Sequence, residues 1–99
     1  MASVRLLRLA EADLEEAVGW YEVRSPQAAR RFEDAVTAAL GRISAFPEMY
    51  PLADDLHRIC PVRRSQYLII YRYERTADEV VVIAVAHASQ DPSAWQSRV

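Results

Sequence analysis

The sequence predicts an α+β fold in which a short N-terminal strand leads into an antiparallel two-helix hairpin and then a three-stranded antiparallel sheet. In the first half of the chain, apolar residues recur at the spacing of amphipathic helices. In the second half, two nearly continuous apolar runs cover residues 67–71 and 80–86. Strands that are apolar at nearly every position have both faces covered, so these two are expected in the centre of the sheet. The helical hairpin is therefore predicted to cover one sheet face.

The first two elements are a strand within residues 4–9 and the helix that follows it. Acidic residues crowd the start of this helix, where negative charge is favourable. Trp20 lies about a quarter turn away from the apolar positions, so we expect it at the edge of the packed face. The buried stripe of this helix comprises Leu14, Ala17, Val18 and Tyr21.

The second helix is predicted to begin at Ser25-Pro26 and to end at Phe46-Pro47. Serine is a favourable cap, and proline is suited to the first helical position. At the other end, the residue before a proline is pushed out of the α region. The apolar stripe between these limits consists of Ala29, Phe32, Val36, Ala39 or Leu40, and Ile43.

Three strands are predicted in the second half of the chain. Residues 47–56 carry no periodicity and form a surface connection, whereas residues 58–62 suit an edge strand because Pro61 cannot donate to a ladder. Residues 76–79 form the turn between the two central strands. Alternation of side chains places Leu68, Ile70, Arg72 and Glu74 on one sheet face, and Tyr67, Ile69, Tyr71 and Tyr73 on the other.

Length and cysteine usage indicate a single domain over residues 1–99 in a reducing compartment. The longest apolar runs are far shorter than the ~20 residues of a membrane helix. The amino terminus has no apolar segment typical of a secretion signal. Cys60 is the only cysteine, so no internal disulfide can form. We therefore expect a cytoplasmic protein without membrane contact.

Charge is divided unevenly along the chain, and every basic residue is an arginine. Residues 1–55 carry six arginines and ten acidic residues, whereas residues 56–99 carry six and four. The helical half is therefore net −4 and the strand half net +2, for a total of −2. Dedicated nucleic-acid binders usually have a clear basic excess, so no direct nucleic-acid binding is expected.

The metal-capable residues Asp54, Asp55, His57 and Cys60 lie close together in the sequence. Structural zinc sites need a second ligand pair further along the chain, and the sequence has none. We therefore expect no metal and no other cofactor.

His87 precedes Ser89 and Asp91, the residue types of a nucleophilic relay. A relay needs a histidine that reaches both partners, and residues this close along one segment seldom converge in that way. We expect His87 to hydrogen-bond the tail where the strand leaves the sheet, and we expect no catalytic residue. A cluster of arginines in the strand half has two open interpretations, either solvated surface charge or an electropositive patch for an acidic protein surface or a phosphate backbone. The cluster comprises Arg58, Arg63, Arg64 and Arg72.

An ordered set of short motifs extends over nearly the whole chain. It comprises Ala12-Asp13-Leu14 to Trp20-Tyr21, Ala29-Arg30-Arg31-Phe32, Phe46-Pro47, Val62-Arg63-Arg64 to Tyr67-Leu68-Ile69-Ile70-Tyr71-Arg72, and the His87 to Trp95 tail. No single piece is specific. In this order, the set resembles the RelE/ParE superfamily of bacterial toxins, and its ParE-like branch in particular.

The resemblance implies a non-enzymatic toxin of a type II toxin–antitoxin module, which inhibits DNA gyrase by protein–protein binding. It also implies a hetero-oligomer with a ParD-like antitoxin that neutralises the toxin. The ribonuclease branch of the superfamily cuts messenger RNA in the ribosome and needs cations on the scissile phosphate. Leu68 and Ala88 stand where that branch is expected to carry arginine. A ribosome-dependent endonuclease is the second hypothesis, and a non-toxic relative that only binds an antitoxin is the third.

Two binding surfaces are expected. An amphipathic antitoxin helix laid against the hairpin is a standard recognition mode, and the candidate residues for it are Leu14, Val18, Trp20, Tyr21, Phe32 and Val36. The target is expected on the strand half, where Trp95 is either an exposed anchor or folded back over a sheet edge. The candidate residues for target binding are Arg63, Arg64, Arg72, His87, Trp95 and Arg98.

Overall fold

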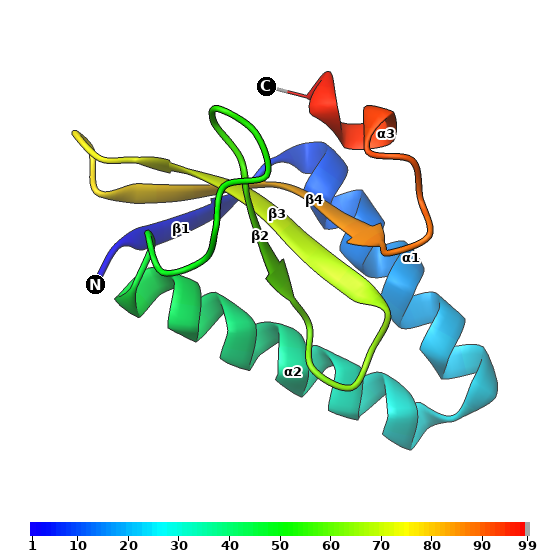
Figure 1. The fold of residues 1–99 in the computed structure, drawn as a ribbon. Coiled ribbons are helices and arrows are strands. Elements are labelled where there is room, and N and C mark those ends of the chain that lie inside the picture. The colour runs from blue at the N-terminus through cyan, green and yellow to red at the C-terminus, as the bar shows by residue number, and fades with distance from the viewer. Residues whose placement is uncertain (99) are drawn as a thin grey trace.

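The computed structural model, which describes residues 1–98, has the predicted order of a strand, two helices and three further strands (Figure 1). A short helix near the C terminus is the one element of the described chain that the sequence did not predict. The bounds are β1 (Ser3–Leu6), α1 (Arg8–Arg24), α2 (Pro26–Ala45), β2 (Arg58–Pro61), β3 (Tyr67–Glu74), β4 (Glu79–His87) and α3 (Ser93–Gln96).

The four strands form one mixed sheet in the order β1-β4-β3-β2. The antiparallel pairing of β2 with β3 and of β3 with β4 is confirmed, as is the central place of β3 and β4. The prediction of a three-stranded sheet was wrong, because β1 adds a fourth strand parallel to β4, with Val4 opposite Val80. β1 has only four residues, and its alternation of side chains is too short to predict that it pairs with β4.

The two helices begin and end close to the predicted residues. α1 starts at Arg8, so Leu9 belongs to the helix and not to the first strand. Ser25 is the only residue between the helices, and its Oγ accepts a hydrogen bond from the backbone N–H of Ala28 at 3.3 Å. Pro26 occupies the first position of α2, as expected. Within residues 1–98, neither helix is long and apolar enough to cross a membrane.

One face of the sheet packs on the helical hairpin, as predicted. Ile43 of α2 is fully buried there with Ile69 and Tyr71 of β3. The Tyr71 hydroxyl donates a hydrogen bond to the carbonyl oxygen of Pro47 at 2.7 Å, and burial raises the pKa of Tyr71 to about 12. Because its hydroxyl has a partner, the ring is buried without the cost of an unsatisfied polar group.

The opposite face of the sheet is covered by α3. Ile70 and Val81 form a second core there with Trp95. Figure 1 shows α3 on the other side of the sheet from α2. Ile69 and Ile70 belong to different cores, which confirms the alternation predicted for this strand. Both sheet faces are therefore occupied, and free surface is left mainly on the helices and loops.

Candidate functional site

Trp20 is the most prominent aromatic side chain on the outside of the helical hairpin. It is 47% exposed, in agreement with its predicted place at the edge of the packed face. The guanidinium carbon of Arg24 lies 3.4 Å from the centroid of the indole ring, and Arg24 also donates a hydrogen bond to the Trp20 carbonyl oxygen at 2.8 Å. Tyr21 meets the same ring edge-on at 4.9 Å between centroids. The indole is thus exposed and held in one orientation, which suits a protein-binding anchor.

The other residues expected to bind an antitoxin mainly hold the hairpin on the sheet. Phe32 and Val36 are buried in the core, and Leu14 and Val18 pack against the same core, half-buried. Tyr21 stacks on Phe32 at 4.7 Å between centroids. Val36, assigned as a contact residue, is buried because this part of the apolar stripe of α2 packs against the sheet, so its contact with an antitoxin stays a prediction.

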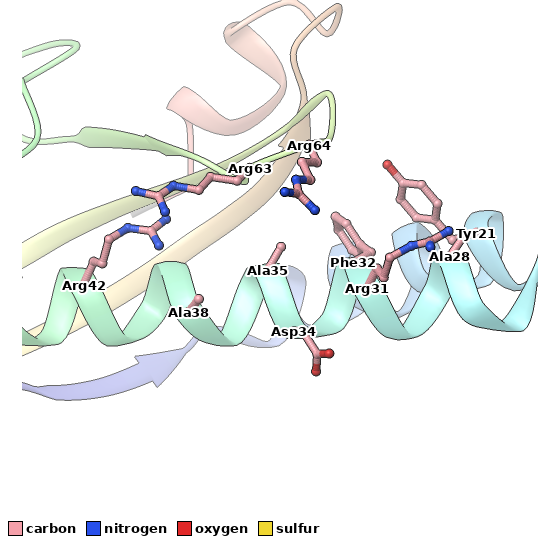
Figure 2. Close-up of a pocket in the computed structure, with 10 residues that line it drawn as sticks. All are labelled: Tyr21, Ala28, Arg31, Phe32, Asp34, Ala35, Ala38, Arg42, Arg63 and Arg64. Atoms are coloured by element: carbon pink, nitrogen blue, oxygen red, sulfur yellow. The ribbon is translucent and has the colours of Figure 1, made fainter.

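A groove of about 710 Å³ lies between α2 and the loop that joins β2 to β3 (Figure 2). Alanine side chains of α2 line its floor, and the rings of Phe32 and Tyr21 lie towards the end opposite Arg42. Figure 2 shows Asp34 pointing away from it, on the far side of α2. We call this surface the arginine groove, and its lining residues are Tyr21, Ala28, Arg31, Phe32, Asp34, Ala35, Ala38, Arg42, Arg63 and Arg64.

The loop above the groove is held by its own hydrogen bonds. The Ser65 hydroxyl donates to the carbonyl oxygen of Val62 at 2.8 Å and accepts from the backbone N–H of Tyr67 at 3.0 Å. The N–H of Val62 donates to the carbonyl oxygen of Tyr67 at 2.9 Å. Arg64 has φ = 59°, a left-handed conformation that is uncommon for a residue other than glycine. This turn presents Arg63 and Arg64 above α2.

The predicted target-binding surface is divided between separate places. Arg63 and Arg64 lie on the helical side of the molecule. Arg72 pairs with Glu74 at 2.8 Å, and Trp95 is only 5% exposed, with its ring 5.6 Å from that of His57. Trp95 is therefore folded back, over a sheet face rather than a sheet edge. Its hydrophobic area is already used within the chain.

His87 is the last residue of β4 and hydrogen-bonds the tail that follows the strand, as expected. Its Nδ1 lies 2.7 Å from the Ser89 Oγ, and its backbone N–H donates to the Gln90 side chain at 2.9 Å. Asp91 accepts instead from the backbone N–H of Ser93 at 2.9 Å, which lowers the pKa of Asp91. Histidine, serine and aspartate are not linked in a relay.

Asp54 and His57, two of the metal-capable residues, form hydrogen bonds with each other. Asp54 accepts hydrogen bonds from the ring and backbone of His57 and from the backbone of Leu56, and these bonds lower the pKa of Asp54 to about 2. Cys60 is fully buried. Across residues 1–98 there is no group of three or more histidine, cysteine or acidic side chains that could hold a metal ion.

Two features were missed by sequence reasoning. Arg98, assigned to target binding, lies 2.6 Å from a carboxylate oxygen of Asp13 in α1, and no sequence signal marks this pair. The arginine groove did leave a signal, because Arg31, Ala35, Ala38 and Arg42 recur at helical spacing along one line of α2. Their significance depends on the loop that lies opposite.

A comparison with protein families assigns this chain to the toxins of type II toxin–antitoxin systems. A family model described as the ParE toxin of type II toxin–antitoxin system, parDE, matches residues 4–92, and this chain belongs to that family. The matched part ends just before α3, so the helix that covers the second sheet face lies outside it. No curated protein sequence gives a significant match.

Solved structures of toxin–antitoxin systems have the same fold. A chain of the toxin–antitoxin complex RelBE2 from Mycobacterium tuberculosis is 24% identical with a TM-score of 0.61, covering 87% of this chain and 96% of that one. A chain of a chromosomal ParDE toxin–antitoxin system from P. aeruginosa is 19% identical with a TM-score of 0.64, covering 88% and 96%. At these identities, the likeness supports the fold alone.

Proposed function

We propose that this ParE-family toxin inhibits DNA gyrase by protein–protein binding and is neutralised by a ParD-like antitoxin. The family match over residues 4–92 is the observation that carries the proposal. An exposed aromatic anchor at Trp20 and a groove lined by arginines offer surfaces for protein partners. The single buried cysteine is consistent with a place in the reducing cytoplasm.

We further propose that the toxin acts without catalysis of its own. RNA cleavage without a metal needs a base for the 2′-hydroxyl and cations on the scissile phosphate. The small cavity beside His87 is lined by Asp13 and Glu16. Asp13 is paired with Arg98, and the negative charge of Glu16 opposes a phosphate backbone. Leu68 and Ala88 supply no cation. These features favour inhibition by binding over ribonuclease activity.

Induced expression in a bacterium, followed by assays on the purified protein, tests the proposal. Filamentation with DNA damage, and inhibition of gyrase supercoiling in vitro, are the expected results. Co-expression of a candidate antitoxin should restore growth and yield a complex that survives gel filtration. Normal growth together with antitoxin binding would instead support a non-toxic relative.

Ribosome-dependent cleavage is the competing outcome. Purified protein added to translating ribosomes should leave the message intact, as judged by primer extension. Cleavage in the ribosomal A site that is abolished by His87→Ala would replace gyrase inhibition with the endonuclease hypothesis. The matched control is Ser93→Ala, which alters the same tail away from the His87 ring.

A further inference from the structure

The tail that covers the second sheet face has few fixed points. Residues 88–94, which lead from β4 into α3, are all exposed. In the described part of the tail, residues 88–98, Trp95 is the only buried side chain, and Arg98 is the only residue in an ion pair, which it forms with Asp13. One ring and one ion pair are therefore the main contacts that hold α3 over the sheet.

Two buried nitrogen atoms on this side of the sheet lack a hydrogen-bond partner among residues 1–98. They are Nε2 of His57 and Nη1 of Arg72. His57 is 5% exposed, and its ring meets that of Trp95 at a steep angle. The side chain of Arg72 is 17% exposed and pairs with Glu74 through Nε. A buried polar atom without a partner destabilises the folded state, and such atoms are rare in proteins.

The strand register brings these two side chains together. Arg58 lies opposite Tyr71 in the antiparallel pair of β2 and β3, so His57, one residue earlier, comes opposite Arg72. Side chains that face each other in this way share one sheet face, with their Cβ atoms about 4.5–5.5 Å apart. Trp95 packs in the same core as Ile70, two residues before Arg72 in β3. The two nitrogens without partners are therefore neighbours on the face that α3 covers.

Opening of α3 would admit water to both nitrogens and so remove part of the cost of the closed arrangement. It would also uncover Ile70, Val81 and Ile83, which are fully buried. His57 would keep its place, because its Nδ1 lies 2.8 Å from the Asp54 carboxylate and its backbone N–H donates to the same group. The opened face would present apolar side chains beside an arginine fork, which fits an apolar segment that carries a carboxylate.

We propose that α3 is a releasable cover and that the target of the toxin takes its place on the second sheet face. The target would insert apolar side chains where Trp95 now packs, together with a carboxylate that pairs with Nη1 of Arg72. This inference rests on the proposed function, because it takes gyrase as the target. It goes beyond that function by naming the surface, the chemistry of the segment that binds there and the movement that exposes it.

The exposure of Trp95 in the complex tests whether the cover opens. Trp20→Phe toxin labelled with 5-hydroxytryptophan can be excited apart from the tryptophans of gyrase, and its signal comes from Trp95 alone. Acrylamide should quench this emission poorly in the free toxin and readily after purified gyrase is added. The matched control is labelled Trp95→Phe toxin, in which quenching of Trp20 should not increase. If Trp95 stays protected in the gyrase complex, α3 remains closed and the inference is wrong.

Substitution of Arg72 separates target binding from stability. Arg72→Met keeps the apolar stem and removes the nitrogen without a partner, so the melting temperature should not fall. The concentration that half-inhibits gyrase supercoiling should rise at least about tenfold, because the carboxylate of the target loses its partner. The matched control is Arg75→Met, which removes the same charge from the β3–β4 turn, where Arg75 pairs with Glu48. It should change inhibition less than about threefold.

Weakening the anchor of the tail tests the cover from the opposite direction. Arg98→Ala removes the ion pair with Asp13 and should raise the population of the open form. Inhibition of gyrase should therefore strengthen about threefold or more, although the free toxin becomes less stable. Weaker inhibition by Arg98→Ala would show that the target needs the closed tail, and it would overturn the inference.

The outcomes distinguish this inference from the function beneath it. If the parent toxin does not inhibit gyrase, both are overturned. If the parent inhibits and Arg72→Met inhibits equally, only the assignment of the second sheet face is overturned. If Arg72→Met loses antitoxin binding but still inhibits gyrase, the face belongs to the antitoxin and the inference is wrong. If Arg72→Met does not fold, the quenching of Trp95 and the Arg98→Ala variant decide the question.

Discussion

The carboxylate of Asp13 in α1 joins the C-terminal tail to the open edge of β4 through Arg98. One Asp13 carboxylate oxygen lies 2.6 Å from Nη1 of Arg98. The same oxygen accepts a hydrogen bond from the backbone N–H of Val85 at 3.1 Å. The same Arg98 nitrogen donates to the carbonyl oxygen of Ile83 at 3.1 Å. β1 pairs with β4 only as far as Val82. Beyond that point, two side chains from distant parts of the chain bind backbone groups that a neighbouring strand would otherwise bind.

Breaking this pair should loosen the tail and expose the strand edge. Arg98→Ala is expected to lower the free energy of unfolding by about 1–2 kcal/mol, because the pair is partly buried and carries charge-assisted hydrogen bonds. Hydrogen exchange of the Val85 amide should accelerate in Asp13→Ala, which removes its acceptor. A double-mutant cycle between Asp13 and Arg98 should give a coupling energy close to the loss of unfolding free energy measured for Arg98→Ala. Additive effects would show that the two side chains stabilise the protein independently.

Trp95 should behave as a core residue in solution. The protein has two tryptophans, so in Trp20→Phe all tryptophan fluorescence comes from Trp95. That emission should resist acrylamide quenching, whereas Trp20, isolated by Trp95→Phe, should be quenched readily. Trp95→Ala is expected to cost about 3 kcal/mol of stability, because it leaves a cavity beneath α3. A stability change below about 0.5 kcal/mol, as at an exposed site, would contradict the observed packing.

Trp20 should matter for binding and little for stability. Trp20→Ala is expected to weaken the antitoxin complex by about 2 kcal/mol, as exposed aromatic anchors do at interfaces. The free toxin should lose less than about 1 kcal/mol, because almost half of the side chain is already in solvent. The matched control is Val23→Ala, which removes an exposed apolar side chain from the same turn of α1. An unchanged Kd for Trp20→Ala would remove this residue from the interface.

The hydrogen bonds to Asp54 should make part of the stability depend on pH in the acid range. They lower the pKa of Asp54 from 3.8 to about 2, so the folded protein takes up this proton less readily than the unfolded chain. The stabilisation is therefore present above pH 3.8 and is lost as the pH falls towards 2. Asp54→Asn should melt at a lower temperature than the parent at neutral pH, and the difference should shrink on acidification. A difference that stays constant with pH would show that the carboxylate charge is not the cause.

Local patterns were sufficient to predict every element except α3, and the packing of the helical hairpin on one face of the sheet. The apolar stripes of the two helices, the Ser25-Pro26 start and the break at Phe46-Pro47 agree with α1 and α2. The apolar run from Val80 to Ala86 became a fully buried central strand. These signals are reliable because helix caps and buried stripes act between residues close in sequence.

The tertiary structure alone decided which elements and side chains far apart in the sequence meet. The parallel pairing of β1 with β4 and the ion pair of Asp13 with Arg98 join residues from opposite ends of the chain, and the burial of Trp95 depends on its packing against β3 and β4. The arginine groove likewise needs the loop at Arg63 to lie over α2. A sequence determines which side chains are apolar or charged at each position. Contacts between distant residues depend on how whole elements pack, because the energy that selects them comes from burial shared across the entire core.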